Sequence, residues 1–147
     1  MTIVVAVDRS SHRNNLVEEG AKLADALGQE LHIVHVLSQQ KFIELERTSV
    51  EQTRQTIDKS EIERIAAEIA REAIDKELNV TYETIGCVGV PSDEIISYTE
   101  EVDAEYLVIG GRRRSPVGKA IMGSVTQSVL LGAACPVVGV LQSEHDR

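Results

Sequence analysis

Runs of aliphatic and β-branched residues recur along the chain and predict the strands of a sheet that is covered on both faces. Residues 3–7 (IVVAV) and 31–36 (LHIVHV) form two of these runs. Two more lie at 106–109 (YLVI) and at 136–141 (PVVGVL). Nearly continuous apolar character of this kind is typical of strands buried inside a parallel sheet.

Helical periodicity separates these runs. Apolar residues at three- and four-residue spacing predict a first helix that Gly28 ends, and a longer helix from about residue 62 to residue 79. A short helix is expected to begin at Pro91, and a last helix at Gly123–Ser124. Each predicted helix therefore lies between two predicted strands.

Two other segments have different patterns. Residues 80–85 alternate between apolar and polar positions, which favours an edge strand with one wetter face, closed by Gly86 and Gly89. Residues 38–48 are polar and show no clear period, so we expect a mobile connection there.

The order of these elements predicts an α/β fold. Five strands alternating with four helices favour a doubly wound parallel sheet with right-handed crossovers and helices on both faces. No repeat or linker divides the chain, so residues 1–147 are interpreted as one domain. In open sheets of this class, ligands bind beyond the carboxyl ends of the strands, where the strand order reverses. Asp8, Val36 and the pair Gly110–Gly111 fall at such ends.

Composition narrows the classes of function. The net charge of −9 disfavours nucleic acids and anionic membranes as partners, because both would be repelled. Aromatic residues make up only 3% of the chain, so few side chains are available to stack on nucleobases. No apolar run approaches the roughly 20 residues of a membrane span, and the first residues lack the basic region of a signal peptide. We therefore expect a cytoplasmic protein.

The cysteine and histidine residues do not predict a metal site. Cys87 and Cys135 are far apart and form no CxxC pair, which favours reduced, partly buried thiols. His32 and His35 lie in a strand pattern and are interpreted as packing residues. Asp8 has two open interpretations. It is either a magnesium or ribose ligand, or a strand-end carboxylate that caps the following turn.

The segment from Gly110 to Ser124 has the features of a phosphate cradle. It leaves a buried strand, passes through a loop and enters a helix. Its glycines allow a ligand close to the backbone, and free amides at the start of the helix attract anions. The segment also carries a local cluster of four positive charges in a chain that is acidic overall: Arg112, Arg113, Arg114 and Lys119. Such a reversal of sign would concentrate a polyphosphate.

Structural explanations of the same residues stay open. Residues 124–127 (SVTQ) fit a capping box, in which Ser124 only satisfies helix amides. The arginines would then be a solvated loop. The segment is neither a Walker A loop nor the GxGxxG of a dinucleotide site, since the required spacings are missing.

Taken together, these landmarks resemble the universal stress protein family over nearly the whole chain. The resemblance is carried by residues 3–8 (IVVAVD), by 33–36 (IVHV), and by the block from Val108 to Val138. It implies the strand order 3-2-1-4-5 and a fold like that of the adenine nucleotide alpha hydrolases. ATP-binding members have a Gly-x-x-Gly-x9-Gly-Ser/Thr pattern in the last block.

This chain matches that pattern at three positions and departs from it at one. Gly110, Gly123 and Ser124 are in register, whereas Arg113 replaces the second glycine. The Arg113 side chain would either block the close approach that a glycine permits, or swing outward and neutralise phosphate charge.

The resemblance also implies a role for each site residue. Asp8 and the backbone around Val36 would face the adenosine, while Ile109 and Gly110 would border the nucleotide. The phosphates would be held by Gly123, by Ser124 and by the backbone amides of Val125 and Thr126. Arg113 would lie beside the phosphates.

The function implied is the binding of ATP or a related adenine nucleotide, with or without Mg²⁺, in a stress-linked regulatory role. The alternative is a nucleotide-free dimeric interaction module, which the departure at Arg113 favours. No catalytic residue is assigned, and at most slow ATP hydrolysis is expected. Members of the family commonly dimerise through the last strand, so a homodimer through residues 136–141 is expected.

Overall fold

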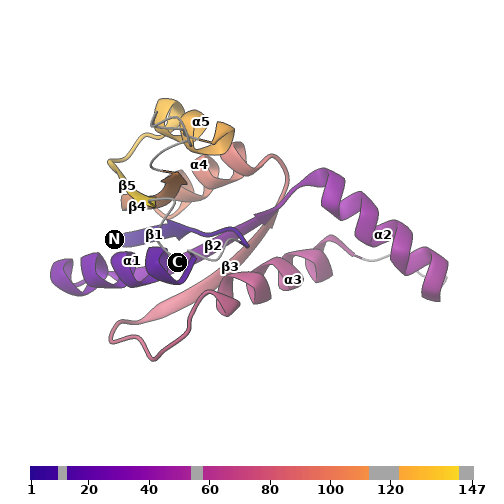
Figure 1. Cartoon of the computed structure of the whole chain (residues 1–147), viewed down its shortest axis with the longest axis horizontal. Coiled ribbons are helices and arrows are strands. Elements are labelled where there is room, and N and C mark those ends of the chain that lie inside the picture. The colour runs from indigo at the N-terminus through magenta and orange to yellow at the C-terminus, as the bar shows by residue number, and fades with distance from the viewer. Residues whose placement is uncertain (10–12, 54–57, 113–122, 143–147) are drawn as a thin grey trace.

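The five strands form one parallel sheet in the order β3-β2-β1-β4-β5 (Figure 1). The computed structural model describes residues 1–9, 13–53, 58–112 and 123–142. Every neighbouring pair of strands is parallel. The strands are β1 (Thr2–Ala6), β2 (Glu30–Leu37), β3 (Tyr82–Val88), β4 (Ala104–Arg112) and β5 (Val137–Gln142). The predicted fold class and the implied strand order are both confirmed.

Helices cover both faces of the sheet. They are α1 (Arg13–Leu27), α2 (Gln39–Thr53), α3 (Lys59–Glu72), α4 (Pro91–Glu101) and α5 (Ser124–Gly132). Figure 1 shows α1 and α3 on one face, α4 and α5 on the other, and α2 extending away from the sheet. Within the residues that the structure describes, no helix combines the length and the apolar composition needed to cross a membrane.

The alternation of strand side chains explains why the apolar runs are continuous. Ile33 lies in the core cluster on the α1 side, whereas Val34 lies in the cluster that α4 and α5 cover. In the same way, Val5 lies in the cluster on the α1 side and Val4 in the cluster under α4 and α5. Since successive side chains of a strand point to opposite faces, a strand between two helical layers needs apolar residues at every position.

The predicted mobile connection at 38–48 is wrong, because residues 39–48 belong to helix α2. The Lys41 amide donates a 3.2 Å hydrogen bond to the Ser38 hydroxyl, and the Phe42 amide donates to the Ser38 carbonyl. Phe42 and Leu45 pack against a small core cluster. The described part of the chain therefore contains five helices, one more than predicted. None of the described α2 side chains is fully buried, so the helix needs no regular stripe of apolar residues that would reveal it in the sequence.

The prediction that Gly86 closes β3 is wrong, because the strand continues through it to Val88, whereas Gly89 follows the end of the strand as predicted. A Cβ atom at Gly86 would lie 1.9 Å from the Glu63 carbonyl oxygen and 2.4 Å from the Ala67 amide nitrogen. Gly86 thus marks the point where α3 packs directly on the strand backbone. By contrast, Gly28 ends α1 as expected, in the left-handed region at φ 66°.

Candidate functional site

The strand order reverses at β1, whose two neighbours are β2 and β4. The chain leaves β1 toward β2 and β3 on one side, and later returns to β4 and β5 on the other. This is the switch point at which open α/β sheets bind ligands. Asp8 is exposed just beyond β1, Val36 is buried near the end of β2, and Gly110 lies in the last part of β4. These three predicted nucleotide-site residues therefore gather at the carboxyl edge of three adjacent strands.

A hydrogen bond joins the end of β4 to the first turn of α5. The Thr126 hydroxyl donates to the Gly110 carbonyl oxygen over 2.9 Å. On the other face, Leu16 closes on Gly110: a Cβ atom there would lie 3.0 Å from the Leu16 Cδ1. Ile109, the preceding residue, is buried. Gly110 is thus held between α1 and α5, and its backbone fixes where α5 begins.

The first turn of α5 starts at Gly123, which is the N-cap residue with φ −66° and ψ 158°. The capping box considered for Ser124 is wrong, because Ser124 is the first residue inside the helix and the Gln127 amide donates to the Gly123 carbonyl. The first amides of a helix have no acceptor within it and carry the positive end of its dipole. Gly123, Ser124 and Val125 are exposed, so the helix start is accessible to an anion.

The end of β1 is fixed by its neighbour β2. The His35 Nδ1 donates to the Val7 carbonyl oxygen over 2.8 Å, and the Val7 amide donates to Val34. Burial lowers the pKa of His35 below its ordinary value, although the Val7 hydrogen bond acts in the opposite direction. A neutral imidazole suits this buried position. The interpretation of His35 as a packing residue agrees with these contacts, and Asp8 follows directly on a rigid strand end.

The remaining predicted site residue, Arg113, lies outside the described residues, as do the other residues from 114 to 122. Two features of the structure were missed from the sequence, one in this site and one outside it. One is the Thr126 side-chain bond, since only the Thr126 amide was assigned a role. The other is a group of carboxylates around His32, which lies elsewhere on the sheet and is described below.

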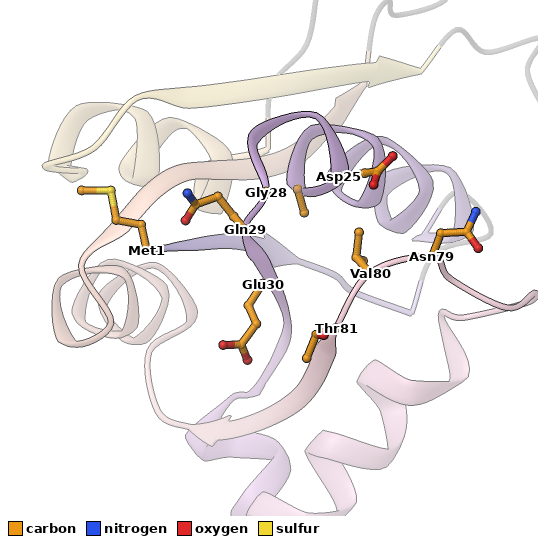
Figure 2. Close-up of a pocket in the computed structure, with 9 residues that line it drawn as sticks. Met1, Asp25, Gly28, Gln29, Glu30, Asn79, Val80 and Thr81 are labelled. Carbon is orange, nitrogen blue, oxygen red and sulfur yellow. The ribbon is translucent and has the colours of Figure 1, made fainter.

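A pocket of about 440 Å³ lies at the opposite, amino-terminal end of the sheet (Figure 2). It is lined by residues at the starts of β1, β2 and the approach to β3, among them Met1, Glu30 and Thr81. Its lining includes the carboxylates of Asp25 and Glu30. Because the pocket lies at the other end of the strands from Asp8, Val36 and Gly110, it is not the predicted nucleotide site.

The strand order and the helices on both faces define an α/β protein of the doubly wound class. The model of the universal stress protein family matches residues 1–140. The chain therefore belongs to the universal stress protein family.

Individual proteins agree with this assignment. A universal stress protein of Mycolicibacterium smegmatis is 43% identical over 70 residues, and this match spans about half of each protein, 47% of this chain and 54% of that one. The solved universal stress protein of Archaeoglobus fulgidus is 33% identical, with a TM-score of 0.61 and coverage of 95% of this chain and 97% of that chain. A structure of the universal stress protein from Archaeoglobus fulgidus in complex with dAMP is 27% identical, with a TM-score of 0.55, and covers 95% and 96% of the two chains.

Proposed function

We propose that this protein binds ATP or a related adenine nucleotide at the carboxyl ends of β1, β2 and β4, in a stress-linked regulatory role in the cytoplasm. The observation that carries the proposal is the hydrogen bond from Thr126 to Gly110, which holds the exposed start of α5 against the strand end at the switch point. The dAMP complex of the similar Archaeoglobus fulgidus protein supports the choice of an adenine nucleotide.

Each end of the site suits one part of the nucleotide. Val36 and Ile109 are buried apolar residues that would border the adenosine, and exposed Asp8 offers a carboxylate to the ribose or to Mg²⁺. The free amides of Ser124, Val125 and Thr126 would donate to phosphate oxygens. Among the described residues, none would lie within 4 Å of a Cβ atom at Gly123, which agrees with an open approach to these amides.

The proposal predicts that ATP with Mg²⁺ raises the melting temperature of the purified protein. A ligand that binds only the folded state at 100 times its Kd adds about 2.7 kcal/mol of stability, which for a chain of this size is about 5–10 °C. Differential scanning calorimetry with ATP, ADP, dAMP and GTP would measure the shift and its base preference. An unchanged melting temperature at millimolar adenine nucleotide would favour the nucleotide-free interaction module instead.

Arg113 is tested by two substitutions with opposed outcomes. If its guanidinium pairs with phosphate, Arg113→Ala should weaken ATP binding by about 1–3 kcal/mol, as the loss of a charge-assisted hydrogen bond does. If the side chain obstructs the backbone, Arg113→Gly should strengthen binding instead. Isothermal titration calorimetry measures both. Equal affinities in all three proteins would show that Arg113 does not act on the nucleotide.

We further propose that the protein forms a homodimer through residues 136–141. β5 has only β4 beside it and is therefore an edge of the sheet. Near this edge the chain exposes three leucines, Leu130, Leu131 and Leu141, with Leu131 90% exposed. Exposed apolar side chains beside an unpaired strand edge are features of an association surface.

A lysine introduced at this edge should prevent the two chains from pairing and give a folded monomer. Val138 and Val140 pack partly against the core, so lysine there would also disturb folding. Leu141 is 51% exposed, which makes Leu141→Lys the cleaner change. Light scattering should show a dimer for wild type and a monomer for Leu141→Lys. Leu27→Lys, on α1, is the control and should remain dimeric. A wild-type monomer at micromolar concentration would refute this interface.

A further inference from the structure

One buried histidine and two carboxylates converge near the amino-terminal ends of β2 and β3. The His32 Nε2 lies 3.6 Å from a Glu30 carboxylate oxygen and 3.4 Å from a Glu83 carboxylate oxygen. One ligand atom from each of the three residues lies within 4.8 Å of the other two. The three residues are called the β2–β3 cluster below.

The sheet itself places these side chains together. Glu30 and His32 are two residues apart on β2, so both point to the same face. His32 pairs with Glu83 in the parallel register of β2 and β3. His32 is only 9% exposed, while the side chains of Glu30 and Glu83 are 48% and 60% exposed. The cluster thus has a fixed imidazole on its inner side and two solvent-reaching carboxylates on its outer side.

Tyr98 of α4 fixes the orientation of the imidazole. Its hydroxyl lies 2.6 Å from the His32 Nδ1, and the two rings are in contact at 5.9 Å between centroids. Burial, together with the charge of Glu83, raises the pKa of Tyr98 to about 12, so the phenol keeps its proton at neutral pH. An imidazole held at one nitrogen by an oxygen partner, with the other nitrogen turned to carboxylates, is the arrangement found around metal-bound histidines.

The two separations between His32 Nε2 and the carboxylate oxygens suit a shared cation better than a direct hydrogen bond. At 3.4 and 3.6 Å, the two N···O distances exceed the usual 2.7–3.2 Å range of N–H···O bonds. Zinc binds histidine nitrogen and carboxylate oxygen at about 2.0–2.2 Å, and two ligands of a tetrahedron with such bonds lie about 3.3–3.6 Å apart. We propose that the β2–β3 cluster binds one zinc ion through His32, Glu30 and Glu83, with water at the fourth position.

Charge supports the same conclusion. Among the described residues, no lysine or arginine forms an ion pair with Glu30 or Glu83, whose only such partner is His32. A divalent cation would neutralise the two carboxylates. An ion on Nε2 requires a neutral ring with its proton on Nδ1, and the Tyr98 oxygen then accepts that hydrogen bond. The cluster lies near the opposite end of the strands from Asp8 and Gly110, so it is separate from the nucleotide site.

The direct test is a titration of the full chain with ZnCl₂ in the absence of nucleotide, followed by calorimetry. One zinc ion should bind per chain. Glu83→Gln and Glu30→Gln keep the size of exposed side chains, and each should weaken zinc binding by more than about tenfold, because each removes an anionic ligand. Tyr98→Phe removes the partner of Nδ1 and should weaken binding by about 10- to 100-fold. Substitution of Co²⁺ should give the intense visible bands of a tetrahedral site.

The controls separate this cluster from other zinc ligands in the chain. The double variant His12→Gln/His145→Gln removes histidines outside the described residues, and Glu68→Gln removes an exposed carboxylate of α3; both should keep the wild-type affinity. The Cys87 thiol competes poorly, since burial raises its pKa to about 11. The proposal is overturned if micromolar wild-type protein binds no zinc at a 100-fold molar excess of the ion. It is also overturned if Glu83→Gln and Glu30→Gln bind zinc as wild type does, or if the double histidine variant loses the ion.

Discussion

Gly86→Ala should destabilise the protein by about 3 kcal/mol, because the added methyl group has no space. The new Cβ atom would lie 1.9 Å from the Glu63 carbonyl oxygen and 2.4 Å from the Ala67 amide. Both are backbone atoms of α3, so no side-chain rotation relieves the overlap. Either α3 moves away from β3 or the strand bends, and each loses buried apolar contacts. Urea denaturation followed by circular dichroism would measure the loss.

Gly139→Ala is the matched control for this change. Gly139 is also a glycine within a strand, but a Cβ atom there would meet no atom of the described residues within 4 Å. Its free energy of unfolding should stay within about 0.5 kcal/mol of wild type. If Gly86→Ala proved as stable as Gly139→Ala, the close packing of α3 on β3 would be incorrect.

Gly123→Val should abolish the stabilisation by ATP while leaving the free protein folded. A Cβ atom at Gly123 would meet none of the described residues within 4 Å, and φ −66° is accessible to valine. The new side chain would fill the space in front of the first amides of α5, which the phosphates must approach. The expected loss is the whole ligand-induced gain, about 2.7 kcal/mol at 100 times the wild-type Kd. Calorimetric melting with and without ATP would measure it.

Ser128→Val provides the control, since it adds the same side chain to an exposed position of α5 beyond its first turn. That variant should keep the full ATP-induced shift. An equal shift in Gly123→Val would mean that the phosphates bind elsewhere on the protein.

The strands were predictable because burial on both faces leaves a direct trace in the sequence. Val4 and Val5 pack into different core clusters, and the apolar run that contains them predicted β1. α2 left no such trace, because most of its described side chains are exposed and Ile43 reaches solvent. Gly86 was misinterpreted for a different reason: a glycine that ends a strand and one that admits a helix look alike in sequence.

The sequence predicted where the candidate site lies, but not which residues contact one another there. Strand ends and a helix start can be located from the sequence, which is why Asp8, Gly110 and Gly123 were selected. The hydrogen bond from Thr126 to Gly110 depends on the placement of α5 against β4. The pairing of His32 with Glu83 depends on the register of two strands that are far apart in the chain. A shift of one residue would turn Glu83 to the other face, and the sequence does not specify that register.

The measurement that tests the central claim most directly is equilibrium dialysis of the purified chain against radiolabelled ATP with Mg²⁺. The proposed site predicts saturable binding of one nucleotide per chain. Unlabelled ADP or dAMP should displace the label, and GTP should displace it poorly. The same experiment with Gly123→Val should show no specific binding. Absence of saturable ATP binding by the wild-type chain at millimolar nucleotide would contradict the proposed function.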